Sequence, residues 1–273
     1  MRRLLILLLV MLGVVANAQQ KGDFGIAYYN VDKLYDTIPS RFYDDRAYTP
    51  AGKLGWDSRR YHKKIDQVSA VIDSMALPVV ALFGVENEQV VKDIVSACGE
   101  DYAYIHRTSN RYDGLDFALL YFADYLYPDR VTEHRGALCV EGTTVDDEPL
   151  TIIATNRSTS LGVLLDEQKS RVDNKIIIIG DIGELNFKKY ALRDAFAGVE
   201  SAGRGNRITQ GVWKLCDRVL VNFDASFQCD VYAQRWLLDR YGEPQPTFKG
   251  AKYCAGVSSY LPIYIYFEKI FAH

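Results

Sequence analysis

Residues 78–84 read PVVALFG, a short apolar run that opens with a proline and closes with a glycine. Such a run is typical of a buried β-strand. The segments on either side carry apolar residues at helical spacing. In residues 56–75 these are Ile65, Val68, Val71, Ile72 and Met75, and in residues 86–98 they are Val90, Val91, Ile94, Val95 and Cys98. With the apolar run FGIAYY at residues 24–29, the pattern predicts the order β-α-β-α for the first hundred residues.

Beyond Gly99 the pattern changes to short strands separated by turns. The strands are predicted at residues 102–106, 115–122, near 137–140, 150–156, 175–179, 212–215, 217–223, 229–233 and 261–267, with a short helix at 161–172. The sequence contains no internal repeat and no low-complexity linker. We therefore expect one domain in which two β-sheets stack face to face with helices outside.

Composition and charge narrow the classes of function. The chain has 273 residues, 48% of them apolar and 25% charged, which excludes disorder, collagen and coiled coil. Lys and Arg number 32 and Asp and Glu 35, so the formal net charge is −3. No global basic surface exists to hold a nucleic-acid backbone, and a nucleic-acid partner would need a local patch.

The amino terminus has the pattern of a secretory signal peptide. Arg2 and Arg3 precede an apolar run at residues 4–15, which leads into the small-residue site Ala16-Asn17-Ala18. The run is shorter than a membrane span requires, and no cysteine follows it to carry a lipid. We expect a signal peptide at 1–18, a mature domain at 19–273 without a membrane span, and export to the periplasm or the outside of the cell.

The cysteine pattern contains no CxxC motif and no Cys/His cluster of the zinc type. Export makes disulfides possible without making them necessary for a domain of this size. We expect buried free thiols with at most a pair or two bridged. The five residues are Cys98, Cys139, Cys216, Cys229 and Cys254.

Seven stretches carry motifs that can be compared with those of known families. They are YYNVDKLYDT at 28–37, YTPAGKLGWDSRRYHKKIDQVSAVI at 48–72, LFGVEN at 82–87, GLDFALLY at 114–121, GDIGE at 180–184, LCDRVLV at 215–221 and SSYLPIYI at 258–265. In this order they resemble the endonuclease/exonuclease/phosphatase superfamily, the deoxyribonuclease-I-like fold, and in particular its exported bacterial branch. The resemblance implies an α/β, four-layer sandwich of two mixed β-sheets with helices outside. It also implies catalysis of phosphodiester hydrolysis with a divalent metal, Mg²⁺ in the family.

Five positions depart from the motifs of that family. Its metal-binding glutamate falls at Gly84 and its catalytic histidine at Asn156, while the asparagine of GDFND falls at Gly183. The aspartate and histidine of SDHLP fall at Ser259 and Tyr260. The resemblance therefore implies a degenerate site with no intact catalytic set and no bound cofactor, because neither asparagine nor neutral tyrosine exchanges protons near pH 7. The polar positions that remain are Asn30, Asp116, Asp181 and Asp217.

The resemblance also implies where these residues lie. We expect Asn30, Gly84, Asn156, Asp181, Ser259 and Tyr260 to converge at one end of the sheets. The retained residues can also be explained by structural roles. In these roles Asp181 would cap its turn, Asn30 would satisfy the backbone of residues 31–37, and Asp217 would form a hydrogen bond with Tyr260.

Three functions from different classes remain open. The first is an exported, non-catalytic relative that uses the old cleft to bind an unknown ligand or protein partner. The second is an active Mg-dependent endonuclease or phosphodiesterase whose metal is held by the rearranged set Asn30, Glu86 and Asp181. Glu86 lies two residues from the lost ligand position, about 6.6 Å along a strand. The third is a purely structural partner in an envelope assembly.

Overall fold

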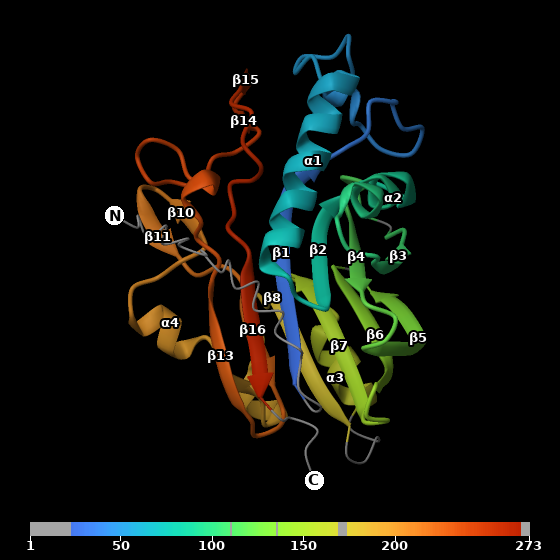
Figure 1. The fold of residues 1–273 in the computed structure, drawn as a ribbon, viewed down its shortest axis with the longest axis vertical. Helices are drawn as coiled ribbons and strands as arrows, with labels where there is room; N and C mark the ends of the chain where they lie inside the picture. Colours follow the sequence, from blue (N-terminus) through green and yellow to red (C-terminus); the bar gives the residue numbers. More distant parts are fainter. Residues whose placement is uncertain (1–22, 110, 135, 169–173, 269–273) are drawn as a thin grey trace, which may run out of the picture.

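Two six-stranded sheets form the centre of the molecule (Figure 1). The computed structural model describes residues 23–109, 111–134, 136–168 and 174–268. The predicted signal peptide therefore lies outside the described residues. The first sheet has the order β13-β16-β1-β2-β4-β3. Its strands are β1 Phe24–Leu34, β2 Val79–Val85, β3 Ala103–Arg107, β4 Asp116–Tyr121, β13 Ser226–Val231 and β16 Ile263–Glu268.

The second sheet has the order β5-β6-β7-β8-β12-β9. Both sheets are mixed, because β1 pairs with β2 and β7 pairs with β8 in parallel while the other pairs are antiparallel. This arrangement confirms the predicted α/β sandwich. The strands of this sheet are β5 Leu126–His134, β6 Ala137–Thr144, β7 Pro149–Asn156, β8 Lys175–Asp181, β9 Arg193–Asp194 and β12 Arg218–Val221.

Helices α1 (Ser58–Met75) and α2 (Glu88–Ala97) cover the outer face of the first sheet. Asp57 caps α1 by accepting from the Arg60 backbone N–H, and Asn87 caps α2 by accepting from Val90. On the second sheet, apolar residues of α3 (Leu161–Gln168) pack against outward-facing residues such as Ile153 and Ile178. None of the helices in the described part of the chain is long and apolar enough to cross a membrane.

Smaller elements complete the fold. They are η1 Arg46–Tyr48, η2 Phe187–Tyr190, α4 Ala197–Ser201, η3 Arg235–Leu237 and two hairpins, β10 Arg207–Thr209 with β11 Val212–Lys214, and β14 Phe248–Lys249 with β15 Lys252–Tyr253. The five cysteines are free thiols, as favoured from the sequence, but only Cys139 is buried; the prediction of burial is wrong for Cys98, Cys216, Cys229 and Cys254, which are half-buried.

The main core lies between the two sheets, where alternate residues of each strand point inward. In β8, Ile177 and Ile179 face this core while Ile176 and Ile178 face α3. This alternation determines which side chains face the interior at the end of the sandwich, where strands β1, β7 and β8 end. That end carries most of the residues singled out from the sequence.

Candidate functional site

Gly84 sits in a bulge of β2. The pairing of β2 with β1 shifts register between Asn30 and Leu34, and its pairing with β4 shifts between Phe83 and Val85. Gly84 has φ +98°, and a Cβ atom at this position would lie 2.0 Å from the backbone oxygen of Asp32. No side chain fits here unless the backbone of Asp32 moves. The space that a side chain of residue 84 would enter is therefore filled by the main-chain carbonyl group of Asp32.

Asp32 itself has a left-handed backbone, with φ +61°. Its N–H donates to the side-chain oxygen of Asn30 at 3.0 Å, as expected for an asparagine that satisfies this loop. Its carboxylate accepts from the backbone N–H of Ser259 at 2.7 Å and from the Ser259 hydroxyl. The Ser258 hydroxyl donates to the backbone oxygen of Asn30 at 2.7 Å. The end of β1 and the segment before β16 are thus held together by side chains.

Asp181 is engaged at both carboxylate oxygens. It lies opposite Asn156 in the parallel pairing of β7 with β8. Arg157 Nε donates to Asp181 Oδ2 at 2.8 Å, and the Gly183 N–H donates to Oδ1 at 3.0 Å, which caps the turn after β8. The Arg157 side chain is 76% exposed, so this ion pair adds little to the free energy of unfolding. Its importance here is that it places the positive guanidinium of Arg157 against the carboxylate, where it competes with any bound cation.

Tyr28 and Asp217 form the floor of the site. Tyr28 is fully buried, and its ring passes over Gly180 of the opposite sheet. Burial and the nearby charges of Asp217 and Asp181 raise the pKa of its hydroxyl well above the ordinary value. Asn156 and Tyr260 also lie close enough to influence it. The residues expected to converge therefore surround two residues of β1, Tyr28 and Asp32.

Asp217 does not bond Tyr260, which corrects the sequence-based expectation. Its Oδ2 accepts from the side-chain amide of Asn206 at 2.5 Å, and Oδ1 makes no hydrogen bond with any residue that the structure describes. Burial raises the pKa of Asp217 to about 7, and the Asn206 hydrogen bond opposes that shift. Tyr260 instead accepts a hydrogen bond from Arg207, whose guanidinium lies 4.5 Å from the centre of the tyrosine ring. Neither Asn206 nor Arg207 lies in a family motif, so sequence comparison missed both.

Glu86 is separated from this site. Its Oε2 accepts from the Asp36 N–H at 2.6 Å and its Oε1 from the Tyr43 hydroxyl at 2.8 Å. Burial raises the pKa of Glu86 to about 7. It lines a cavity of about 370 Å³ that also contains Asp116. Asp181 lines a different cavity, so Glu86 and Asp181 do not share a pocket as the rearranged metal set of Asn30, Glu86 and Asp181 requires.

Asp116 belongs with a neighbouring loop. Its Oδ1 accepts from the backbone N–H of Ser109 at 2.8 Å and from the Ser109 hydroxyl at 2.7 Å. His106 Nε2 lies 3.2 Å from Asp116 Oδ2, a contact that sequence order alone did not indicate. The pair is almost fully buried, with 5% and 1% of the two side chains exposed. The arrangement supports the loop between β3 and β4.

The site does not fit the divalent metal of the family. Such an ion needs several oxygen ligands at short, fixed distances. Position 84 has no carboxylate, the Asn30 and Asp181 oxygens already accept hydrogen bonds from the chain, and Glu86 faces another cavity. Among the described residues, no three His, Cys, Asp or Glu side chains gather as a cluster that could hold a metal ion.

A cleft of about 1030 Å³ remains beside Asp181. It extends between the turn after β8, the start of α3 and the strand β11. Its charged lining is mostly basic, consisting of Arg157, Lys189, Lys214 and Arg218 with Asp181 and Glu184. Arg218 is paired with Asp194 at 2.6 Å. The volume is at the upper end of that of ordinary small-molecule sites.

Comparisons with known proteins agree with this architecture. A model of the Endonuclease/Exonuclease/phosphatase family matches residues 25–173, more than half of the chain. A search of the curated proteins finds no match.

Among solved structures, TDP2 from Caenorhabditis elegans is 13% identical with a TM-score of 0.58, covering 90% of this chain and 74% of its own. An endonuclease/exonuclease/phosphatase from Bacteroides vulgatus is 13% identical with a TM-score of 0.59, over 91% and 99%. The mannosyl-6-phosphatase Bt3783 of Bacteroides thetaiotaomicron is also 13% identical, with a TM-score of 0.55, over 89% and 98%. At this identity the three structures show the shared fold.

Proposed function

The chain belongs to the endonuclease/exonuclease/phosphatase family, and from that membership we propose that it is an exported, non-catalytic relative that binds a ligand in the old cleft. The family comprises phosphodiesterases, phosphatases and nucleases, and it generally uses a divalent metal.

One observation carries the proposal. The backbone oxygen of Asp32 lies 2.0 Å from where a Cβ atom of residue 84 would be. Position 84 therefore lacks a metal-binding carboxylate for two reasons: the residue is a glycine, and the main chain leaves no room for a side chain. The Asp32 carboxylate anchors this arrangement through Ser259, which stands where the family has an aspartate.

The groups for proton transfer point to the same conclusion. Asn156 cannot titrate, and the pKa of Tyr260 is raised to about 12 by burial, although the nearby Arg207 opposes the shift. Asp217, the group that would orient a histidine, is bonded to Asn206 instead. General acid–base catalysis typically contributes about 10² to 10⁴-fold to a rate, and a metal adds several kcal/mol of charge stabilisation.

Turnover assays test the loss of catalysis. The purified protein is incubated with Mg²⁺ or Mn²⁺ and with plasmid DNA, RNA, bis-p-nitrophenyl phosphate or a phospholipid. We expect no turnover above that of an Asp181→Ala variant, which controls for a contaminating nuclease. Robust turnover that Asp181→Ala abolishes would show a rebuilt active site, and the non-catalytic proposal would be wrong.

The exported state rests on the amino-terminal pattern. Arg2 and Arg3, the apolar run and the Ala16-Asn17-Ala18 site are those of a signal peptide. We expect cleavage after Ala18, which gives a mature protein that begins at Gln19 and carries a formal net charge of −5. Intact mass or N-terminal sequencing of the protein recovered from its native host decides this, and a product that retains Arg2 and Arg3 would refute it.

A further inference from the structure

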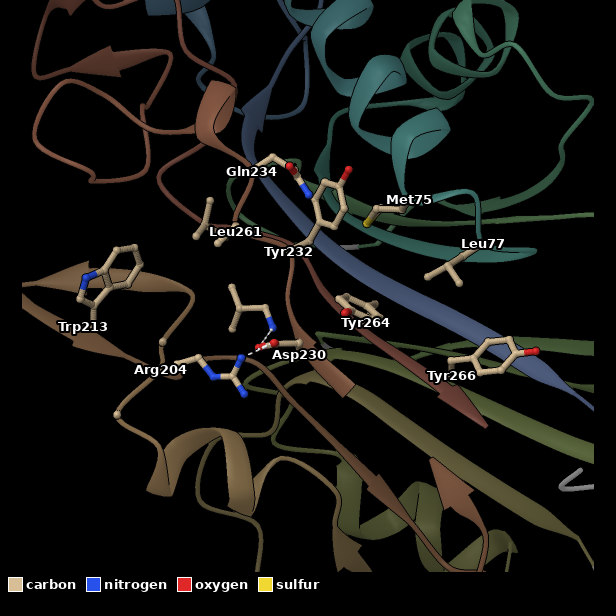
Figure 2. A pocket seen from close by; sticks show the side chains of 14 residues that line it. Met75, Leu77, Arg204, Trp213, Asp230, Tyr232, Gln234, Leu261, Tyr264 and Tyr266 are labelled. Atoms are coloured by element: carbon tan, nitrogen blue, oxygen red, sulfur yellow. Dashed lines mark hydrogen bonds and ion pairs between the residues drawn. The ribbon is translucent and has the colours of Figure 1, made fainter. Parts of the chain in front are cut away.

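A second concave surface lies on the outer face of the first sheet, behind one wall of the cleft. We call it the aromatic groove and define it by four side chains, Trp213, Tyr232, Tyr264 and Tyr266 (Figure 2). Its volume is about 670 Å³, within the range of small-molecule sites. Tyr264 and Tyr266 project outward from β16, whereas Ile263, Ile265 and Phe267 of that strand face the core. Helices α1 and α2 leave this part of the sheet uncovered.

The groove and the cleft share a wall but not their lining. They meet at the β10–β11 hairpin, where Trp213 lines the groove and Thr209 and Lys214 line the cleft. The Leu261 N–H donates to the Asn206 backbone oxygen at 2.7 Å and closes the wall. A ligand in the groove would therefore contact none of the residues that line the cleft.

Two of the four rings are held at their polar ends. The Tyr232 hydroxyl donates to the Ser74 backbone oxygen at 3.1 Å, and the Tyr266 hydroxyl donates to Asp23 Oδ2 at 2.6 Å. The ring faces are therefore fixed before any ligand arrives, which reduces the entropy that binding would cost. Trp213, on the β10–β11 hairpin, lies across the groove from Tyr232 and is 36% exposed.

The charged residues that line the groove disfavour an ionic ligand. Arg204 and Asp230, which lie between Trp213 and Tyr264 in Figure 2, form an ion pair with each other. Asp230 Oδ1 also accepts from the Val231 N–H at 2.7 Å. An anion would have to compete with Asp230, and a cation would have to compete with Arg204. The groove is therefore best matched by a ligand without net charge.

Hydrogen-bonding groups exclude a purely apolar ligand. The Tyr264 hydroxyl, the Trp213 indole N–H and the Gln234 side-chain amide make no hydrogen bond with any residue in the described part of the chain, and all three residues line the groove. A hydrocarbon would bury these groups without partners, which costs free energy. The ligand must both donate and accept, because the groups include an indole donor, an amide and a hydroxyl.

We propose that the aromatic groove binds a neutral saccharide. A pyranose ring has an apolar C–H face that stacks on an aromatic ring and a rim of hydroxyls that both donate and accept hydrogen bonds. A proline-rich segment also stacks on aromatic rings, but its prolines lack N–H donors and leave the acceptor oxygen of the Gln234 side chain unmatched. The observations therefore favour the sugar.

Titration with neutral disaccharides tests the proposal. The probes are cellobiose, mannobiose, lactose and N,N′-diacetylchitobiose at concentrations up to about 10 mM. Binding is followed by calorimetry and tryptophan fluorescence, with a decaproline peptide as the competing ligand class. We expect at least one disaccharide to bind and the peptide not to bind. Trp213→Ala should weaken binding at least about tenfold, and Tyr264→Phe, which removes only the hydroxyl, by about three- to tenfold.

Trp236→Ala is the matched control, since Trp236 is 49% exposed and does not line the groove. It should leave the affinity unchanged. The proposal is overturned if no disaccharide binds, if only the peptide binds, or if binding survives both groove variants. Tyr264→Phe keeps the ring and its packing, so it remains informative if Trp213→Ala does not fold.

Discussion

At the scale of single residues, the site is explained by which atoms already have partners. The Asn30 side chain accepts from Asp32, Asp181 accepts from Arg157 and Gly183, and Glu86 accepts from the loop after β1. The side-chain oxygens of all three residues accept hydrogen bonds from the chain itself. Residue types that perform chemistry in an enzyme here hold turns and loops in place.

Replacement of Gly84 tests the close approach of Asp32. Gly84→Ala should lower the free energy of unfolding by about 2 to 4 kcal/mol, because the added Cβ meets a carbonyl oxygen and the positive φ is strained for alanine. Urea denaturation measures the change. The matched control is Gly242→Ala, at φ +82° with no atom within 4 Å of the added Cβ, which should cost only about 1 kcal/mol. Equal effects at the two positions would contradict the steric argument.

At the scale of elements, the buried carboxyl group of Glu86 is one anchor of the loop between β1 and α1. Glu86, just beyond the end of β2, accepts one hydrogen bond from Asp36 and one from Tyr43. Because burial raises its pKa from 4.5 to about 7, the folded protein holds a proton there that the unfolded chain releases at lower pH. The loop is therefore coupled to a titration in the mildly acidic range.

The sign of the coupling follows from linkage. Between about pH 4.5 and 7 the folded state binds more protons at Glu86 than the unfolded state, so this contribution to stability is full below that window and is lost as the pH rises through 7. The raised pKa of Asp217 changes the free energy of unfolding with pH in the same direction. Glu86→Gln removes one of these titrating groups, so the free energy of unfolding should fall less steeply between pH 5 and 7.5, by roughly the contribution of one proton. Urea denaturation at several pH values measures this fall. The exposed Glu184→Gln is the control and should keep the original slope; an unchanged slope in Glu86→Gln would refute the coupling.

The sequence predicted the long elements well because their patterns are local. The 3.6-residue spacing in α1 and α2 and the isoleucine run of β8 each determine an element without help from distant residues. Strand β5 was missed: Pro128 interrupts its sequence pattern, and the structure places this strand at a sheet edge with a bulge between Pro128 and Arg130, where a proline is tolerated.

The candidate site was less predictable for a physical reason. The motif residues identified the right end of the sheets, but their partners come from segments whose positions depend on the whole fold. Asn206 reaches Asp217 and Arg207 reaches Tyr260 from a short hairpin with no motif of its own. Likewise, the closure of position 84 follows from the left-handed backbone of Asp32, which residue identity does not reveal.

At the scale of the whole molecule, the two ends of the described chain meet in one sheet. Phe24 of β1 lies opposite Phe267 of β16, and β16 lies between β1 and β13. In the second sheet, β8 lies between β7 and β12. Both sheets therefore require strands from the first and the second half of the sequence.

A fragment that ends at residue 173 tests this interdependence. It contains the part matched by the family model but lacks β8, β12, β13 and β16. It would expose the edges of β1 and β7 and lose the buried faces of Ile177, Ile179 and Ile265, so we expect it not to fold cooperatively. Circular dichroism and thermal denaturation beside the full chain measure this. A sharp unfolding transition in the fragment would show that the first half is a domain by itself.

The contact between Asp32 and Gly84 also has an evolutionary consequence. A single Gly84→Glu change would place a side chain against the Asp32 carbonyl, and a single Ser259→Asp change would place a second carboxylate against that of Asp32. The effect of either change therefore depends on the backbone of residues 30–34. A carboxylate can enter position 84 or 259 without loss of stability only if Asp32 is rearranged as well, so any stepwise route to a metal site here passes through destabilised intermediates.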